Sequence, residues 1–245
     1  MPIYGHRARV GYLSGPLYAE AYPYEFYKMA PEGVSLIIST LRFNQGTKEE
    51  IDQCIALGYD IAREMTATGA QCIIQGVVPI NLYYGPQGVQ DFIERAEREC
   101  GIPASTSVTA QVHALQAAGS KKLAVLGLGG ERITNLDEYV TSFGFDIVGY
   151  GFCNYRYVDL GRISPEETCQ KALELARSVP DADTIFVPAP HMPFVVGIER
   201  LEQETGKIVI SAGQAILWEA LRLCKVNDRV DGFGKLLREC VDHVH

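Results

Sequence analysis

The sequence lacks several features that would assign it to a specialised class of protein. No apolar run reaches the roughly 18 residues that a membrane-spanning helix needs, and the N-terminal segment MPIYGHRARVGYLSGP has no long apolar core of a secretory signal. The seven cysteines include no CxxC pair, which fits reduced, buried thiols. Acidic residues outnumber basic ones, with 30 Asp and Glu compared with 22 Lys and Arg. We therefore expect a cytoplasmic protein that binds neither nucleic acid nor membranes.

The composition that remains is typical of a globular enzyme-sized chain. Its 245 residues are 47% hydrophobic and 21% charged, enough for one large domain or two small domains sharing a core. Short apolar strands alternate with amphipathic helices, which predicts the α/β class with mainly parallel sheets flanked by helices. The strands are expected at Arg9–Leu13, Ser35–Ser39, Gln71–Gln75, Ile102–Thr106, Lys122–Leu128, Asp146–Tyr150, Thr184–Pro188 and Lys207–Ser211. The helices are expected at Glu49–Thr68, Gly88–Cys100, Thr109–Ala118, Thr134–Ser142, Pro165–Val179, Val196–Thr205 and Gln214–Leu223.

The two halves of the chain follow the same pattern. Each half has a strand ending in a glycine-containing loop, a strand that runs through prolines to a glycine, and a strand leading into a long helix. The matched segments are Arg9–Pro16 with Leu123–Gly130, Cys72–Gly85 with Thr184–Gly197, and Gly101–Leu115 with Gly206–Leu221. General self-similarity of α/β proteins is the alternative. The duplication predicts two pseudo-symmetric lobes, one of residues 1–118 with 215–245 and one of residues 119–214.

A duplicated parallel α/β chain also predicts where its site lies. Ligands of open parallel sheets bind beyond the carboxyl ends of the strands, so the loops SGP, GLGG, GVVPIN and PAPHMP should face one cleft. Ser107 and Ser211 precede helices, whose N-terminal N–H groups favour an anion. Two such ends suit a small carboxylate or dicarboxylate. Plain N-capping is the alternative for both serines, and the favoured one for Ser107.

His191 is the foremost acid/base candidate, because imidazole titrates near neutrality and the residue lies within the PAPHMP loop. A structural histidine that bonds loop carbonyls is the alternative. Tyr83, Tyr84 and Asn81 in the first-lobe loop could hold a carbonyl or enolate oxygen. Arg42 could pair bidentately with a substrate carboxylate, although solvated arginines are commoner.

The order and spacing of these segments resemble the aspartate/glutamate racemase superfamily, in its maleate isomerase and arylmalonate decarboxylase branch. The resemblance runs from about Arg9 to Val226 and is clearest in GIPASTSVTAQVHALQAAGSKKLAVL, ISAGQAILWEALRL and QGVVPINLYYG. It implies two lobes with the active site between them. It also implies proton transfer or carbanion-like intermediates next to carboxylates, without metal or organic cofactor, and places Ser14 and Gln214 near bound substrate.

The chain departs from this family at its reactive positions. Counting along the matched segments, one family cysteine falls on Ala189 and the other on Gly76 or Val77, and the family tyrosine is replaced at Gly129-Gly130. Racemisation by two thiols is therefore excluded. Cys153 is the remaining thiol that could reach a cleft, although packing is the favoured explanation of it. The candidate site comprises His191, Tyr83 and Tyr84 as catalytic residues and Ser14, Gly15, Arg42, Gly76, Val77, Asn81, Gly129, Gly130, Ala189, Pro190, Ser211 and Gln214 as binding residues.

The sequence thus predicts a cofactor-independent lyase or isomerase of a small carboxylic or dicarboxylic acid, working through an enolate-like intermediate without a catalytic cysteine. A hydrolase or hydratase on the same scaffold, or a carboxylate-binding protein without chemistry, remains open. A dinucleotide site at LAVLGLGGERI is weaker, because Arg132 stands where the third glycine is needed. The expected partner is a small-molecule carboxylate, and homo-oligomerisation is left open.

Overall fold

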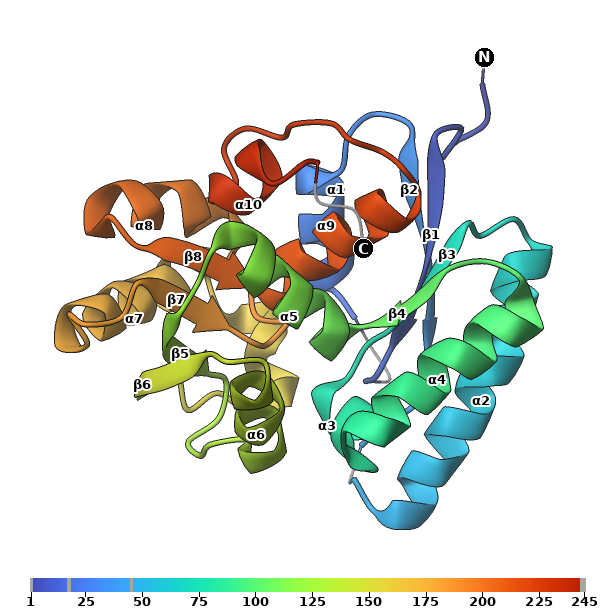
Figure 1. Cartoon of the computed structure of the whole chain (residues 1–245), viewed down its shortest axis with the longest axis horizontal. Coiled ribbons are helices and arrows are strands. Elements are labelled where there is room, and N and C mark those ends of the chain that lie inside the picture. Colours follow the sequence, from blue (N-terminus) through green and yellow to red (C-terminus); the bar gives the residue numbers. More distant parts are fainter. Residues whose placement is uncertain (1, 17–18, 45, 243–245) are drawn as a thin grey trace.

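Two parallel four-stranded sheets form the framework of the described chain (Figure 1). A computed structural model describes residues 2–16, 19–44 and 46–242, so the tail histidines His243 and His245 lie outside the described residues. The first sheet has the order β2-β1-β3-β4 and the second the order β6-β5-β7-β8. Their strands are β1 (Ala8–Ser14), β2 (Val34–Thr40), β3 (Cys72–Gln75), β4 (Ala104–Thr106), β5 (Lys122–Gly127), β6 (Asp146–Phe152), β7 (Thr184–Val187) and β8 (Ile208–Ser211). The identical strand order confirms the predicted two-lobed α/β architecture.

Helices cover both sheets, and the seven predicted ones lie within three residues of their expected ends. The seven predicted helices are α2 (Lys48–Ala67), α4 (Gly85–Cys100), α5 (Ser107–Ala118), α6 (Thr134–Ser142), α7 (Pro165–Ser178), α8 (Ile198–Thr205) and α9 (Ala212–Leu223). The structure adds α1 (Ala21–Met29), α3 (Val78–Leu82), α10 (Gly234–Glu239) and the 3₁₀ turns η1 (Tyr157–Arg162) and η2 (Val195–Gly197). The sequence did not predict these because α1 carries a proline in its first turn and the others are too short to show a helical period.

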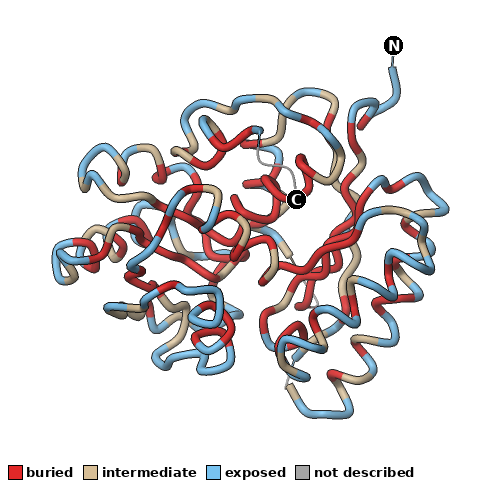
Figure 2. Tube along the Cα trace, viewed as in Figure 1, coloured by how far each residue is buried: buried red, intermediate tan, exposed pale blue. Residues whose placement is uncertain are grey.

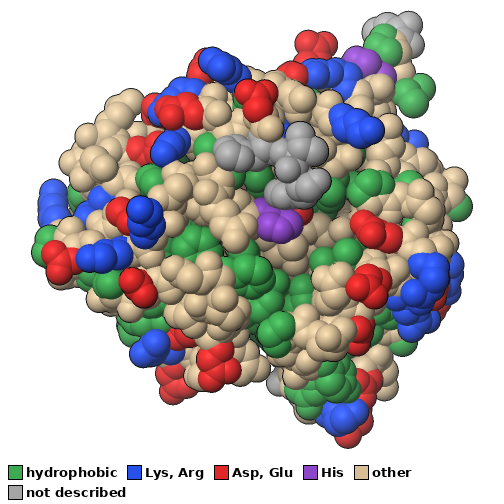
Figure 3. Space-filling model, in the orientation of Figure 1, with side chains coloured by type: hydrophobic (Ala, Val, Ile, Leu, Met, Phe, Trp, Pro, Cys, Tyr) green, Lys and Arg blue, Asp and Glu red, His purple; other side chains and the backbone are tan. Residues whose placement is uncertain are grey.

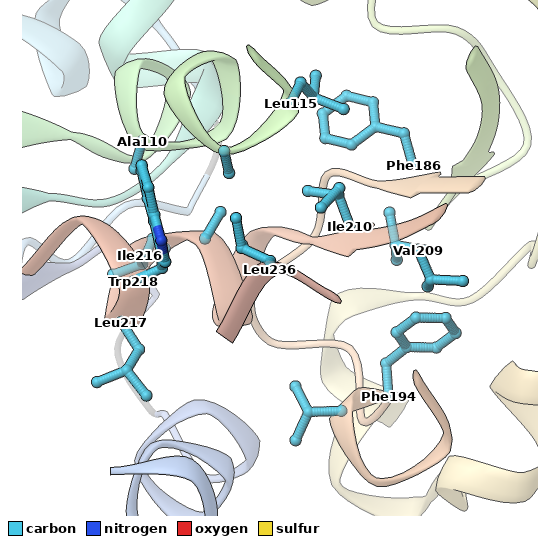
Figure 4. Packing of buried hydrophobic residues seen from close by; sticks show 14 of the residues in the cluster. Ala110, Leu115, Phe186, Phe194, Val209, Ile210, Ile216, Leu217, Trp218 and Leu236 are labelled. Atoms are coloured by element: carbon cyan, nitrogen blue, oxygen red, sulfur yellow. The ribbon is translucent and has the colours of Figure 1, made fainter. Parts of the chain in front are cut away.

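Helices α5 and α9 lie between the lobes at the centre of the molecule (Figure 1). They pack against each other, and α9 also contacts β3 of the first sheet while α5 contacts β8 of the second. Helix α9 is buried on all sides from Ala212 to Arg222, including its polar residues Gln214, Glu219 and Arg222 (Figure 2). Trp218, fully buried, donates its indole N–H to the carbonyl oxygen of Cys240 at 2.8 Å. The lobes therefore share one core, part of which Figure 4 shows.

Short sequence signals determine where several helices begin and end. Thr47 and Ser164 accept a hydrogen bond from the backbone N–H three residues later, at the starts of α2 and α7. Gly101, Gly119 and Gly206 end α4, α5 and α8 in the left-handed conformation that glycine adopts most easily. Each glycine is followed within a few residues by the next strand, so these signals also set the spacing of the parallel units.

On the face of the molecule seen in Figure 3, charged and apolar side chains occupy different regions. Charged groups lie mainly around the periphery, whereas apolar side chains gather between the lobes, above a notch at the lower edge. None of the helices in the described part of the chain combines the length and the apolarity needed to cross a membrane.

Candidate active site

A cavity of about 300 Å³ lies between the carboxyl ends of the two sheets. We call it the inter-lobe cavity. The first lobe contributes residues after β1, β2 and β3, and the second lobe contributes residues after β5, β6 and β7. The lining consists of Pro16, Phe43, Asn44, Val77, Val78, Pro79, Leu128, Ile133, Tyr157, Val158, Pro188, Ala189, Pro190 and His191. Because most of these side chains are apolar, the cavity suits a ligand with an apolar body.

His191 is a titratable group of this lining whose pKa is shifted by burial. It is only 5% exposed, and burial lowers its pKa to about 4. The imidazole is therefore neutral at pH 7 in the free protein. Its Nε2 lies 3.3 Å from Oγ of Ser14, the last residue of β1, so the hydrogen bond joins the two lobes. A neutral imidazole can accept a proton or donate an N–H hydrogen bond to a developing oxyanion.

Val77 forms part of the cavity wall in an unusual backbone conformation. Its φ of +72° lies in the left-handed region, which a β-branched residue seldom occupies. The side chain fits because residue 15 is glycine: a Cβ at Gly15 would lie 1.9 Å from Cγ2 of Val77. Gly76 is similarly enclosed, since its Cβ would lie 2.5 Å from the hydroxyl of Tyr12. These contacts leave no room for a larger side chain at residue 15 or 76.

Two buried phenols lie behind His191. The rings of Tyr12 and Tyr22 are 4.5 Å apart, and the Tyr22 ring is 6.3 Å from the imidazole. Both hydroxyls are buried without a hydrogen-bond partner among the described residues, and burial raises the pKa of both groups. The ring of Tyr157 lies 5.9 Å from the imidazole on the cavity side. The histidine is thus held among aromatic rings, which explains its low solvent exposure.

Charged groups are placed next to the inter-lobe cavity rather than in it. Among the described residues, its lining includes no Asp, Glu, Lys or Arg. A second hollow of about 340 Å³ shares Tyr157, Val158 and His191 with it and adds Glu20 and Arg162. A substrate carboxylate in contact with His191 could therefore reach a guanidinium only on this second side.

Several predicted site residues lie elsewhere. Asn81 is buried on α3, where it donates to Gln75 at 2.9 Å and accepts from Ser107 at 2.9 Å. Tyr83 and Tyr84 are exposed, and Tyr84 bonds Asp52 at 2.5 Å. None of these three lines the inter-lobe cavity. Arg42 is exposed and adjoins the lining residue Phe43 without lining the cavity itself.

The predicted helix N-termini are closed by their own side chains. Ser211 and Gln214 form a capping box at the start of α9, and Gln214 also donates to the carbonyl of Phe233 at 2.6 Å. The N-cap of α5 is Thr106 rather than Ser107, whose hydroxyl is used by Asn81. The expected capping role of Ser107 is therefore wrong.

The remaining candidates follow their strands as predicted, but only some reach the cavity. Ala189, Pro190 and Val77 line it. Gly129 and Gly130 follow the lining residue Leu128 without lining the cavity themselves. The lining residues Phe43, Asn44, Ile133 and Val158 were not predicted, because nothing in the sequence marks a single apolar or amide residue as part of a site. Their only signal was their place in the loops that follow strands.

The geometry of the described residues does not support catalysis by a cysteine, because none of their thiols lines the inter-lobe cavity. Cys153 is buried with its sulfur 3.7 Å from that of Met192, and burial raises its pKa to about 11. Its thiol is therefore protonated at pH 7. No group of three His, Cys, Asp or Glu residues in the described chain is arranged to hold a metal ion.

Comparison with known proteins identifies the family. The family model for arylmalonate decarboxylase matches residues 10–237, which include both lobes and every cavity-lining residue. The chain belongs to the arylmalonate decarboxylase family. It is therefore an enzyme of the lyase and isomerase group in the aspartate/glutamate racemase superfamily, which confirms both the predicted resemblance and the prediction of an enzyme.

Individual relatives are distant but similar along their whole length. Arylmalonate decarboxylase from Bordetella bronchiseptica is 24% identical over 212 residues, covering 83% of this chain and 86% of that protein. A variant of the maleate isomerase Iso from Pseudomonas putida S16, solved with maleate, is 22% identical with a TM-score of 0.84, covering 97% of this chain and 99% of that one. A variant of Nocardia farcinica maleate cis-trans isomerase with a covalently bound succinylcysteine intermediate is 20% identical with a TM-score of 0.77, covering 95% and 98%. These structures confirm the fold.

Proposed function

We propose that this enzyme is a cofactor-independent decarboxylase or isomerase of a small carboxylic or dicarboxylic acid, and that it works without a cysteine thiol. The observation that carries the proposal is His191, a buried neutral imidazole at the wall of a mostly apolar cavity in an arylmalonate decarboxylase family member. The named relatives act on an arylmalonate or on maleate, and one of them forms a bond to a cysteine. Counting along the matched segments puts Ala189 at the expected position of a family cysteine, so we propose proton transfer in place of a covalent thiol step.

The apolar lining favours decarboxylation over isomerisation. Loss of CO2 breaks the bond between the α-carbon and one carboxylate, and the electron pair stays on the substrate as an enolate. A carboxylate placed among Val77, Val78 and Pro188 is poorly solvated, which favours its departure as neutral CO2. The enolate then takes a proton at the α-carbon.

His191 is the group we propose for that proton transfer. A carboxylate bound beside the imidazole opposes the effect of burial and raises the pKa of His191, so the imidazolium forms when the acid binds. The imidazolium can hydrogen-bond the enolate oxygen and then protonate the α-carbon. Ser14, at 3.3 Å from Nε2, holds the ring during the transfer and links it to the first lobe.

An assay in D2O tests this function. We expect the enzyme to convert a phenylmalonate into the corresponding phenylacetate carrying one deuterium at the α-carbon, observed by proton NMR. Maleate, incubated in parallel, tests the isomerase branch through the appearance of fumarate. Pretreatment with a thiol-alkylating reagent should leave turnover unchanged, with Cys153→Ser as the matched variant. Conversion of neither acid, or full loss of turnover in Cys153→Ser, would contradict the proposal.

A further inference from the structure

The loop that carries His191 is attached to the opposite lobe by a buried carboxylate. Glu25 of α1 is 4% exposed, and its Oε1 accepts the backbone N–H groups of Phe194 at 2.6 Å and Val195 at 3.0 Å. These N–H groups belong to the N-cap and the first residue of η2, the single 3₁₀ turn that precedes α8, where the first donors have no partner within the turn. The carboxylate of a first-lobe helix therefore binds the start of this second-lobe turn.

Few other groups could hold this part of the loop. Pro188, Pro190 and Pro193 have no N–H group, so the loop donates few backbone hydrogen bonds. Thr168 of α7 donates to the carbonyl of Pro193, which ties the same segment to its own lobe. Phe194 is buried within the main core (Figure 4). Residue 194 is thus clamped from both lobes, three positions from the imidazole.

Pro193 stands between the clamp and His191, and it limits how far the chain between them can flex. The imidazole is itself bonded to Ser14 of the first lobe. A displacement at residue 194 is consequently transmitted to Nε2 rather than absorbed by the loop. Errors of about 1 Å in the placement of a reacting group can lower a rate by about 100-fold.

From this geometry we propose that Glu25 is a positioning residue, which holds the His191 imidazole at the wall of the inter-lobe cavity by clamping the N–H groups of Phe194 and Val195. The part that concerns turnover rests on the proposed function of His191. The part that concerns placement does not, because the environment of the imidazole can be measured without a substrate.

The chain provides a matched control in Glu202. Its carboxylate also accepts two backbone N–H groups, from Val209 at 3.1 Å and Lys235 at 2.8 Å, but it lies on α8 and contacts no residue of the His191 loop in these bonds. Glu202→Ala therefore removes the same kind of interaction elsewhere. Glu25→Gln is the conservative variant, because one amide oxygen can still accept both N–H groups.

The experiment is an NMR titration of the His191 imidazole, assigned with His191→Asn, combined with steady-state kinetics. In Glu25→Ala we expect the His191 pKa to rise by more than one unit towards 6.5, because the imidazole gains water, and kcat to fall at least tenfold with KM changed less than threefold. Glu25→Gln should stay within threefold of wild type, and Glu202→Ala should change neither quantity. If Glu25→Ala does not fold, Glu25→Asp, which withdraws the oxygens by one methylene, is expected to give the same shifts in smaller degree.

An unchanged His191 titration in Glu25→Ala or Glu25→Asp would overturn the proposal, as would an equal shift in Glu202→Ala. Absence of turnover in the wild type would contradict the proposed function alone, since the titration still reports the placement of the imidazole.

Discussion

The two matched loops of the lobes, GVVPIN after β3 and PAPHMP after β7, place their polar residues in opposite ways. In the first loop the chain enters α3 at Val78, so Asn81 turns inward to Gln75 and Ser107. In the second loop three prolines delay the helix until Val195, so His191 stays in irregular backbone at the cavity wall. Duplicated sequence thus yields one apolar wall and one reactive group, because the start of the helix decides where each side chain points.

The largest expected effect is a change in kcat, which should differ between a variant of one loop and a variant of the other. His191→Asn should lower kcat by about 100- to 10,000-fold, because it removes the proton-transferring group, while Asn81→Ala should leave kcat within about threefold. Steady-state kinetics on the acid that the wild type converts provide the measurement. Comparable losses of kcat in both variants would mean that the loops do not divide structural and chemical roles as inferred.

Stability should depend on pH in opposite ways through the His191 imidazole and through Glu25, which holds the His191 loop. Burial lowers the pKa of His191 from 6.5 to about 4, so its contribution to stability is complete above pH 6.5 and is lost as the pH falls to 4. Burial raises the pKa of Glu25 from 4.5 to about 7, so its contribution is complete below pH 4.5 and is lost as the pH rises to 7. Each group changes the free energy of unfolding by about 3 kcal/mol across its pH range, and the two changes have opposite signs as the pH rises.

Urea unfolding from pH 4 to 7 should reveal both contributions as differences from wild type. The stability of wild type relative to His191→Asn should increase with pH, and that relative to Glu25→Gln should decrease. Two differences that change in the same direction would refute the assignment.

Two matched glycines should respond differently to the same small change. Gly15→Ala should lower the free energy of unfolding by about 1–3 kcal/mol, because the new Cβ would meet Val77 at 1.9 Å. Its second-lobe counterpart Gly129 has nothing within 4 Å of such a Cβ, so Gly129→Ala should change stability by less than about 0.5 kcal/mol. Urea unfolding at constant pH checks both, and equal losses would argue against the tight Gly15–Val77 contact.

The smallest effect concerns Tyr12, whose counterpart in the second lobe is Leu126. Because the Tyr12 hydroxyl is buried without a partner, Tyr12→Phe should stabilise the protein by about 1 kcal/mol. Thermal and urea unfolding provide the measurement. A loss of stability would show that the hydroxyl has a partner such as a bound water.

The sequence predicted the framework better than the site. Strand and helix periodicity located all eight strands and seven of the helices, because the apolar spacing of each predicted segment matches its period. The site candidates were chosen by their place after strands, and this rule found Ala189, Pro190, Val77 and His191. It also selected Ser211 and Tyr84, since sequence position cannot tell a residue that faces the cleft from one that caps a helix or points to solvent.

What the sequence alone determined is the duplicated α/β framework and the absence of cysteine at residues 76, 77 and 189, because strand periods, turn residues and residue identities are local. The packing of the two lobes sets which side chains meet. His191 bonds Ser14 across 177 residues, and Glu25 bonds Phe194 across 169. Such contacts depend on how the lobes pack on α5 and α9, and no local pattern in the chain records the direction in which a side chain points after that packing.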